Sequence, residues 1–255
     1  MTGQDASTAG LSAVRSGWRL NLVLSRPGRR NALDGPTVAA LTGRLSDPGD
    51  ARFVVLTGQP PSFCAGADTA SLAEAGSLED HAEESMALHR MLEAAATCPV
   101  PLVVGVQGHA LGAGCALAAC ADIVVADRNA YFGVPEVRAG VIPAIVAPFI
   151  SRRMLGAGRR YMLSGSQFDA AEAQRTGLVD LISDDLDAQI EGLAWELGRC
   201  GPTALRQAKR LFTESPSPEA QAQMMAELRA GEEAQEGLAA LRERRNPSWT
   251  EVADD

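Results

Sequence analysis

One arrangement recurs in the first half of the chain: an apolar strand, a turn of small residues, and then helical spacing. FVVLTG (53–58) leads to FCAGAD (63–68), and PLVVGVQG (101–108) leads to LGAGCA (111–116). A turn of Gly and Ala lets a ligand oxygen approach backbone N–H groups, and the dipole of the following helix adds positive potential there. Strands and helices that follow one another in this way predict an α/β domain.

Two such N–H groups that converge on one oxygen would form an oxyanion hole. Gly-rich turns before helices are more often packing devices, so the two turns alone leave both interpretations open. Pro135 and Glu136 begin a further helical turn. A carboxylate there can move protons beside a bound carbonyl, or it can simply complement the helix dipole.

The spacing of apolar residues divides the chain into elements. It predicts strands over 18–25, 53–58, 101–108 and 122–126. It predicts helices over 35–46, 79–97, 111–121, 143–155, 157–164, 169–175, 186–200, 202–213 and 217–243. We therefore expect a flexible leader at 1–14, a core over 15–195 and a C-terminal helical region over 196–255.

The charge balance and the apolar runs exclude several classes of protein. The chain has 23 basic and 32 acidic residues, and its formal net charge of −9 argues against nucleic-acid or membrane partners. The longest apolar stretches are interrupted by Gly, Pro or Asp, and the N-terminal residues lack the pattern of a secretory signal. These features predict a cytoplasmic protein.

The cysteines and histidines do not have metal-ligand spacing. The five cysteines form no CxxC pair, so reduced thiols in the core are the expected state. The three histidines form no HExxH motif, and we predict no metal site. His109 lies next to the second turn, where it is expected to be a packed residue rather than a base.

Arginines gather in two segments, RPGRRN near the first strand and RERRN near the C-terminus. Solvated surface charge and a phosphate-binding role explain such clusters about equally well.

The segments FCAGAD, QGHALGAGCALAACADIVVAD and FGVPEVRAGVIP, in this order and spacing, resemble the enoyl-CoA hydratase/isomerase (crotonase) superfamily. The likeness extends from RPGRRNAL to RERRNPSW, which is nearly the whole chain. It implies a spiral of ββα units whose trailing helices assemble trimers, often paired into hexamers. It also implies acyl-CoA thioester substrates and chemistry through an enolate. Coenzyme A would then be part of the substrate, with no tightly bound cofactor.

The resemblance assigns roles to individual residues. Ala67 and Ala113 match the two residues whose backbone N–H groups form the oxyanion hole, and Glu136 matches a catalytic glutamate. Further substrate-contacting positions are implied at Ala65, Gly66, Asp68, Gly112 and, toward the coenzyme A phosphates, Arg26, Arg29, Arg30 and Arg244. Asp68 is also a candidate N-cap for the helix that follows it. Arg244 would act from a neighbouring subunit.

Ala116 is the main departure from the family pattern. Hydratases of the superfamily usually carry a second glutamate at this position, and a methyl group cannot hold the water that hydration needs. A double-bond shift needs only one base, which Glu136 can provide. Some hydratase-like relatives with an EVRxGxIP segment also lack the first glutamate. Hydration and double-bond shift therefore both remain open, together with decarboxylation, thioester hydrolysis or a non-catalytic CoA-binding role.

Overall fold

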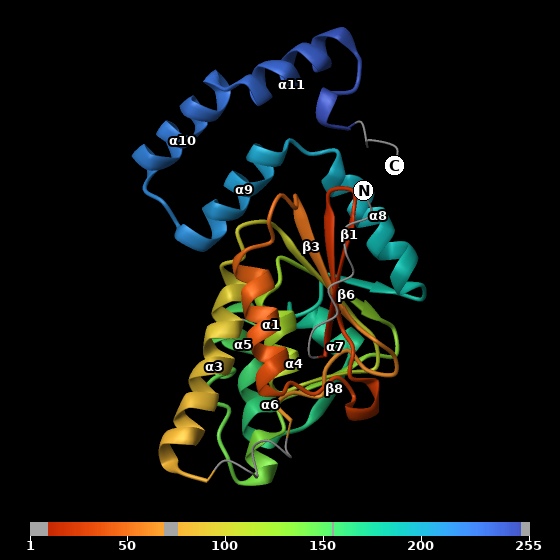
Figure 1. The fold of residues 1–255 in the computed structure, drawn as a ribbon, viewed down its shortest axis with the longest axis vertical. Coiled ribbons are helices and arrows are strands. Elements are labelled where there is room, and N and C mark those ends of the chain that lie inside the picture. Colours follow the sequence, from red (N-terminus) through yellow and green to blue (C-terminus); the bar gives the residue numbers. More distant parts are fainter. Residues whose placement is uncertain (1–9, 69–75, 155, 251–255) are drawn as a thin grey trace.

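The computed structural model describes residues 10–68, 76–154 and 156–250 (Figure 1). Its main sheet has the strand order β1-β2-β3-β4-β6-β9. The strands are β1 Leu11–Ser16, β2 Arg19–Leu24, β3 Phe53–Gly58, β4 Leu102–Val106, β6 Ile123–Asp127 and β9 Leu181–Ser183. Strands β1 and β2 are antiparallel, and every later neighbouring pair is parallel.

A smaller sheet lies beside the main one. It consists of β5 His109–Leu111, β7 Tyr131–Gly133 and β8 Gln167–Asp169, and β5 and β7 are parallel. Cys64 extends this sheet through a parallel bridge to Ala110. Each of three successive passes of the chain therefore contributes one strand to the main sheet and a short extended segment to the smaller one.

Helices cover the sheets and form the C-terminal part. They are α1 Gly35–Ser46, α3 Leu78–Ala96, α4 Ala113–Cys120, α5 Ala147–Met154, α6 Gly158–Ser164, α7 Ala170–Arg175, α8 Leu186–Gly198, α9 Pro202–Glu214, α10 Pro218–Ala230 and α11 Glu232–Glu243. Helix α3 packs against α1 and α4, and α4 packs against α5. Helices α9, α10 and α11 lie together beyond one end of the sheet (Figure 1).

The alternation of side chains along β3 shows how the core is divided. Val54 and Leu56 point into the large core that α1, α3 and α4 cover, whereas Phe53 and Val55 face a second core completed by Ile190 of α8. A strand that is buried on both faces has a continuous apolar sequence. FVVLTG therefore predicts the position of β3 but does not show which of its residues face which core.

The predicted leader is wrong for residues 11–14. Leu11–Ser16 forms β1, with Leu11 and Ala13 buried and every residue of β1 paired with β2. Gly17, at φ +52°, stands in the turn between the two strands. Small and polar side chains hide the alternation of this strand in the sequence. Residues 1–9 lie outside the described part of the chain.

Other differences concern the ends of elements. The helix predicted over 217–243 is two helices, because Gly231 between α10 and α11 is extended. Helix α4 begins at Ala113 rather than at 111, since Leu111 belongs to β5. Strands β5, β7, β8 and β9 have three residues each, too few for an alternating pattern to be visible. Ser77 caps α3; a helix capped by Asp68 would fall in 69–75, outside the described residues.

Four cysteines are buried free thiols, in agreement with their predicted place in the core, whereas Cys200 is exposed. Over the described ranges, no helix combines the length and the apolar character needed to cross a membrane. The same ranges contain no group of three or more His, Cys, Asp or Glu side chains arranged to hold a metal ion.

Candidate active site

The smaller sheet brings three loops to one place. Cys64, β5 and β7 run parallel, so the residues that follow them emerge at the same end of the sheet. The Leu111 N–H donates to the Cys64 carbonyl at 2.9 Å, and the Gly112 N–H donates to the Gly133 carbonyl at 2.9 Å. The segments 65–68, 112–113 and 135–136, which are far apart in the sequence, are neighbours for this reason.

The N–H and C=O groups of Ala67 point away from the segment of Leu33, with which Ala67 forms an isolated bridge. Leu33 donates to the Gly66 carbonyl at 2.8 Å and accepts from the Asp68 N–H at 2.9 Å. In a parallel bridge these two bonds flank the residue opposite, so the N–H and C=O of Ala67 point to the other side. The Ala67 N–H is therefore not used by Leu33.

Ala113 is the first residue of α4, where a helix leaves its N–H groups without intrahelical partners. The sharp turn is made by Gly112, at φ +52°. Among described non-glycine residues, positive φ occurs at Arg30, Asn31, Ser215 and Arg244, so Ala113 keeps an ordinary φ. An alanine is thus no obstacle to the turn.

The first two loops approach each other closely at Gly66. A Cβ added to Gly66 would lie 2.8 Å from the Leu111 carbonyl oxygen and 3.6 Å from the Ala113 nitrogen. Only glycine allows this approach, and its φ of +93° also favours glycine. The residue before Ala67 is therefore in contact with the turn that carries the Ala113 N–H.

Glu136 lies against the same turn. It begins the 3-10 helix Glu136–Ala139, and its Oε1 would be 2.8 Å from a Cβ added to Gly112. Its Oε2 is buried without a hydrogen-bond partner. Burial raises the pKa of the Glu136 carboxyl, opposed in part by a hydrogen bond from its own backbone N–H. Raised pKa values of this kind suit a group that both takes and gives protons near neutral pH.

Ala116 is completely buried in the core, and its N–H donates to the Gly112 carbonyl at 3.0 Å. It supplies a methyl group at the position where the family resemblance implied a carboxylate. His109 is half-buried, and its ring stacks on Tyr131 with centroids 6.0 Å apart. This contact agrees with the predicted packing of His109, and its not acting as a base stays a prediction.

The basic residues of the first loop have different surroundings. Arg26 forms ion pairs with Asp68 at 2.9 Å and with Asp34 at 3.1 Å, so it ties the first loop to segment 65–68. Arg29 and Arg30 are exposed, and neither forms an ion pair with another described residue. The Ala65 N–H donates to the Arg30 carbonyl at 3.0 Å, which places both exposed arginines beside the candidate site.

Asn31 is a residue that the sequence analysis did not single out. It is buried, and its Nδ2 donates to the carbonyls of Gln59 at 2.8 Å and Ser62 at 2.7 Å. Its Oδ1 accepts from the Arg26 N–H at 2.9 Å. Asn31 thus fixes the arginine loop against the loop that leads to Cys64. Its signal in the sequence is an Asn at the end of a turn, where this residue tolerates the left-handed φ of +56° seen here.

Arg244 is not part of this arrangement. It is an exposed residue that ends α11 with a φ of +56°. Figure 1 shows α11 beyond α9, at the opposite end of the molecule from α6 and the lower end of α3. Within one chain, α11, which ends at Arg244, therefore lies apart from α4, which begins after Gly112.

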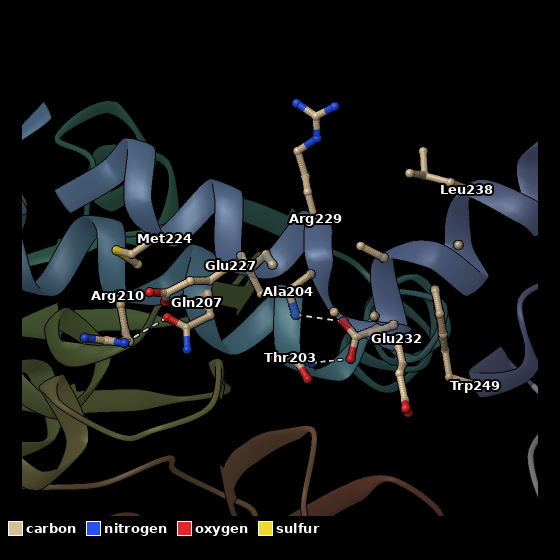
Figure 2. A pocket seen from close by; sticks show the side chains of 16 residues that line it. Thr203, Ala204, Gln207, Arg210, Met224, Glu227, Arg229, Glu232, Leu238 and Trp249 are labelled. Carbon is tan, nitrogen blue, oxygen red and sulfur yellow. Dashed lines mark hydrogen bonds between the residues drawn. The ribbon is translucent and has the colours of Figure 1, made fainter. Parts of the chain in front are cut away.

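A cavity of about 1080 Å³ lies between the C-terminal helices (Figure 2). Its walls come from α9, α10 and α11 and from Trp249, and include Ala204, Met224 and Leu238. Glu233 closes the start of α9 by accepting hydrogen bonds from the N–H groups of Thr203 at 2.8 Å and Ala204 at 2.9 Å. None of the predicted substrate-contacting residues lines this cavity.

Residues 20–252 match the family model described as enoyl-CoA hydratase/isomerase. The chain belongs to the enoyl-CoA hydratase/isomerase family. Among curated relatives, the 2,3-dehydroadipyl-CoA hydratase of Escherichia coli is 34% identical over 248 residues, covering 90% of this chain and 94% of the relative. The cyclohexa-1,5-dienecarbonyl-CoA hydratase of Thauera aromatica is 31% identical over 254 residues, covering 92% and 94%.

Solved structures share the fold of this chain. Pseudomonas aeruginosa AtuE is 35% identical with a TM-score of 0.90, covering 95% of this chain and 100% of that one. An enoyl-CoA hydratase from Shewanella pealeana is 29% identical with a TM-score of 0.89, covering 96% and 97%. The predicted superfamily and its α/β fold with trailing helices are confirmed. The roles of the individual site residues stay predictions.

Proposed function

We propose that this family member acts on enoyl-CoA thioesters, by hydration or by a double-bond shift, with Glu136 as the group that transfers a proton at C2. The thioester oxygen accepts hydrogen bonds from the N–H groups of Ala67 and Ala113. The observation that carries the proposal is the position of Glu136, whose carboxylate lies against Gly112 and has one buried oxygen without a partner.

The two N–H groups stabilise the enolate that forms when the C2 proton moves. One preorganised donor of this kind is worth about 3–4 kcal/mol in the transition state. In a double-bond shift, Glu136 takes a proton from C2 and returns it at C4. In hydration, Glu136 gives a proton to C2 while water adds at C3. The raised pKa of Glu136 favours both directions of transfer.

Coenzyme A enters as part of the substrate. Arg29 and Arg30 are the exposed cations beside Ala65, and we assign them to the coenzyme A phosphates. Arg26 acts indirectly, since its ion pairs with Asp34 and Asp68 hold the loop that presents them. Arg244 would reach a phosphate from a neighbouring chain.

The C-terminal helices fit an assembly of identical chains, a homotrimer or a hexamer made of two trimers. Apolar side chains are exposed along them, at Leu211, Phe212, Met225, Leu238 and Leu241. Leu238 also lines the cavity between these helices (Figure 2), and exposed apolar surface of this kind favours burial against a second copy. Light scattering after gel filtration gives the test: a mass of about one chain at micromolar concentration would contradict the assembly.

The proposed reaction is tested with paired 2-enoyl-CoA and 3-enoyl-CoA substrates, by following the chromophore of the conjugated thioester. We expect Glu136→Gln to lower turnover at least about 100-fold, because positioned proton transfer contributes that much or more. Glu93→Gln, an exposed residue of α3, is the matched control and should retain wild-type rates. Unchanged turnover by Glu136→Gln contradicts the assignment, and release of free coenzyme A or CO₂ would favour a thioesterase or a decarboxylase instead.

A further inference from the structure

Glu84 interrupts the inward face of α3. Leu88, Leu92 and Ala95 follow it at helical intervals and pack toward the core. Although Glu84 belongs to the same face, it carries a carboxylate whose Oε2 is buried without a hydrogen-bond partner in the described part of the chain. Such an oxygen costs folding free energy, so the packing of α3 does not explain why a glutamate stands here.

Glu84 lines a cavity that it shares with Ala67. The cavity has a volume of about 40 Å³, and its other walls include Asp68, Leu33 and Leu88. A cavity of this size with acidic side chains in its wall accommodates a water molecule or a hydroxyl group. Asp34 and Asp68, the other acidic residues of the wall, both pair with Arg26, so Glu84 is the acidic wall residue that has no ion pair among the described residues.

Glu84 and Glu136 have a property in common. Across the described ranges, their Oε2 atoms are the two buried side-chain oxygens or nitrogens without a partner. Glu136 lies at the turn of Gly112 and Ala113, and Glu84 lies at the cavity of Ala67. The two carboxylates that each have an unpartnered Oε2 thus lie beside the two turns that hold the thioester oxygen in the proposed function.

We propose, on the basis of that function, that Glu84 supplies the second carboxylate that position 116 lacks. Its Oε2 accepts a hydrogen bond from an O–H group beside Ala67. This group is the water that adds to C3 of a 2-enoyl thioester or, in the reverse direction, the 3-hydroxyl of the product.

The step balances without an added reagent. Glu84 takes one proton from the water as the C3–O bond forms. The electron pair of the C2–C3 double bond moves to the thioester as an enolate, held by the N–H groups of Ala67 and Ala113. Glu136 then gives its proton to C2. Afterwards Glu84 releases a proton to solvent and Glu136 regains one, so the net change is the addition of one water.

The test compares Glu84→Gln with Glu83→Gln, its exposed neighbour on α3. Hydration of a 2-enoyl-CoA and isomerisation of a 3-enoyl-CoA are measured for both variants. We expect Glu84→Gln to lower hydration about 100-fold or more and to leave isomerisation within about threefold, because only hydration needs the water. Glu83→Gln should change neither rate. Equal losses in both reactions, or hydration that persists in Glu84→Gln, overturn the proposal.

A binding measurement separates this inference from the proposed function. The affinities of wild type and Glu84→Leu for 3-hydroxybutanoyl-CoA and butanoyl-CoA are compared by calorimetry. We expect wild type to prefer the hydroxylated thioester about tenfold, and Glu84→Leu to lose that preference, because the acceptor is gone. Equal affinities of wild type for the two thioesters contradict the role of Glu84, and this result does not depend on any turnover. If Glu136→Gln loses turnover and Glu84→Gln keeps it, the proposed function is supported and the role of Glu84 is contradicted.

Discussion

Replacing Glu136 by Gln should stabilise the fold while it stops catalysis. The wild-type carboxylate is half-buried and has one oxygen without a partner, so its ionised form is poorly compensated. A buried polar group without a partner costs about 1–3 kcal/mol, and a charged one more, so we expect about 1–2 kcal/mol at this partly exposed position. Since a domain of this size shifts by about 2–4 °C per kcal/mol, Glu136→Gln should raise Tm by about 2–8 °C at pH 7.

The gain in Tm should depend on pH with a definite sign. Burial raises the pKa of Glu136 in the folded protein, so folding favours the neutral form of the group. The stability that this neutral form contributes is complete below the unfolded pKa of about 4.3 and is lost as pH rises through the folded value. Gln stays neutral throughout. The difference in Tm should therefore be near zero at about pH 4 and should grow toward pH 7.

Differential scanning calorimetry at both pH values measures this difference, with Glu93→Gln as the exposed control. A Tm for Glu136→Gln that equals or falls below the wild-type value at pH 7 would refute the reasoning. It would mean that a partner satisfies the Glu136 carboxylate in solution.

Three further substitutions give independent checks. Gly112→Ala places a Cβ 2.8 Å from the Glu136 Oε1 at a φ of +52°, so we expect a loss of about 1–3 kcal/mol in unfolding free energy and at least tenfold lower turnover. Ala116→Glu puts a carboxylate in the core and should lower the urea midpoint by the equivalent of about 3 kcal/mol in unfolding free energy. An increase in the hydration of a 2-enoyl-CoA would show instead that position 116 faces the water that adds to C3. Lys209→Met leaves Asp122 without the 2.7 Å ion pair that joins α9 to the sheet, and urea unfolding should show a loss of about 1–3 kcal/mol with unchanged KM.

Much of the fold is predictable because strong patterns produce it. FVVLTG and LVVGV are buried strands, and the turns after them must be small because the loops touch at Gly66. Pro135 and Glu136 predict the start of a helical turn, and the structure places Glu136 against Gly112. These features are local, or they follow from the order of strands, and the sequence shows both.

The features that were not predicted depend on contacts between distant segments. Strand β1 consists largely of small and polar residues and is held by pairing with β2. Asn31 matters because of carbonyls 28 and 31 residues further along the chain. Glu84 is conspicuous only when its side of α3 is known to face inward. No pattern within a window of a few residues contains this information.

The central claim is that Glu136 transfers the proton at C2 of a thioester whose enolate is held by two backbone N–H groups. A saturated acyl-CoA such as butanoyl-CoA has C2 protons but can be neither hydrated nor isomerised. Exchange of these protons in D₂O, followed by NMR, therefore isolates the proposed step. We predict exchange catalysed by the wild-type protein and a rate at least about 100-fold lower in Glu136→Gln. Equal exchange rates in the two proteins, or none above the uncatalysed rate in wild type, would contradict the account.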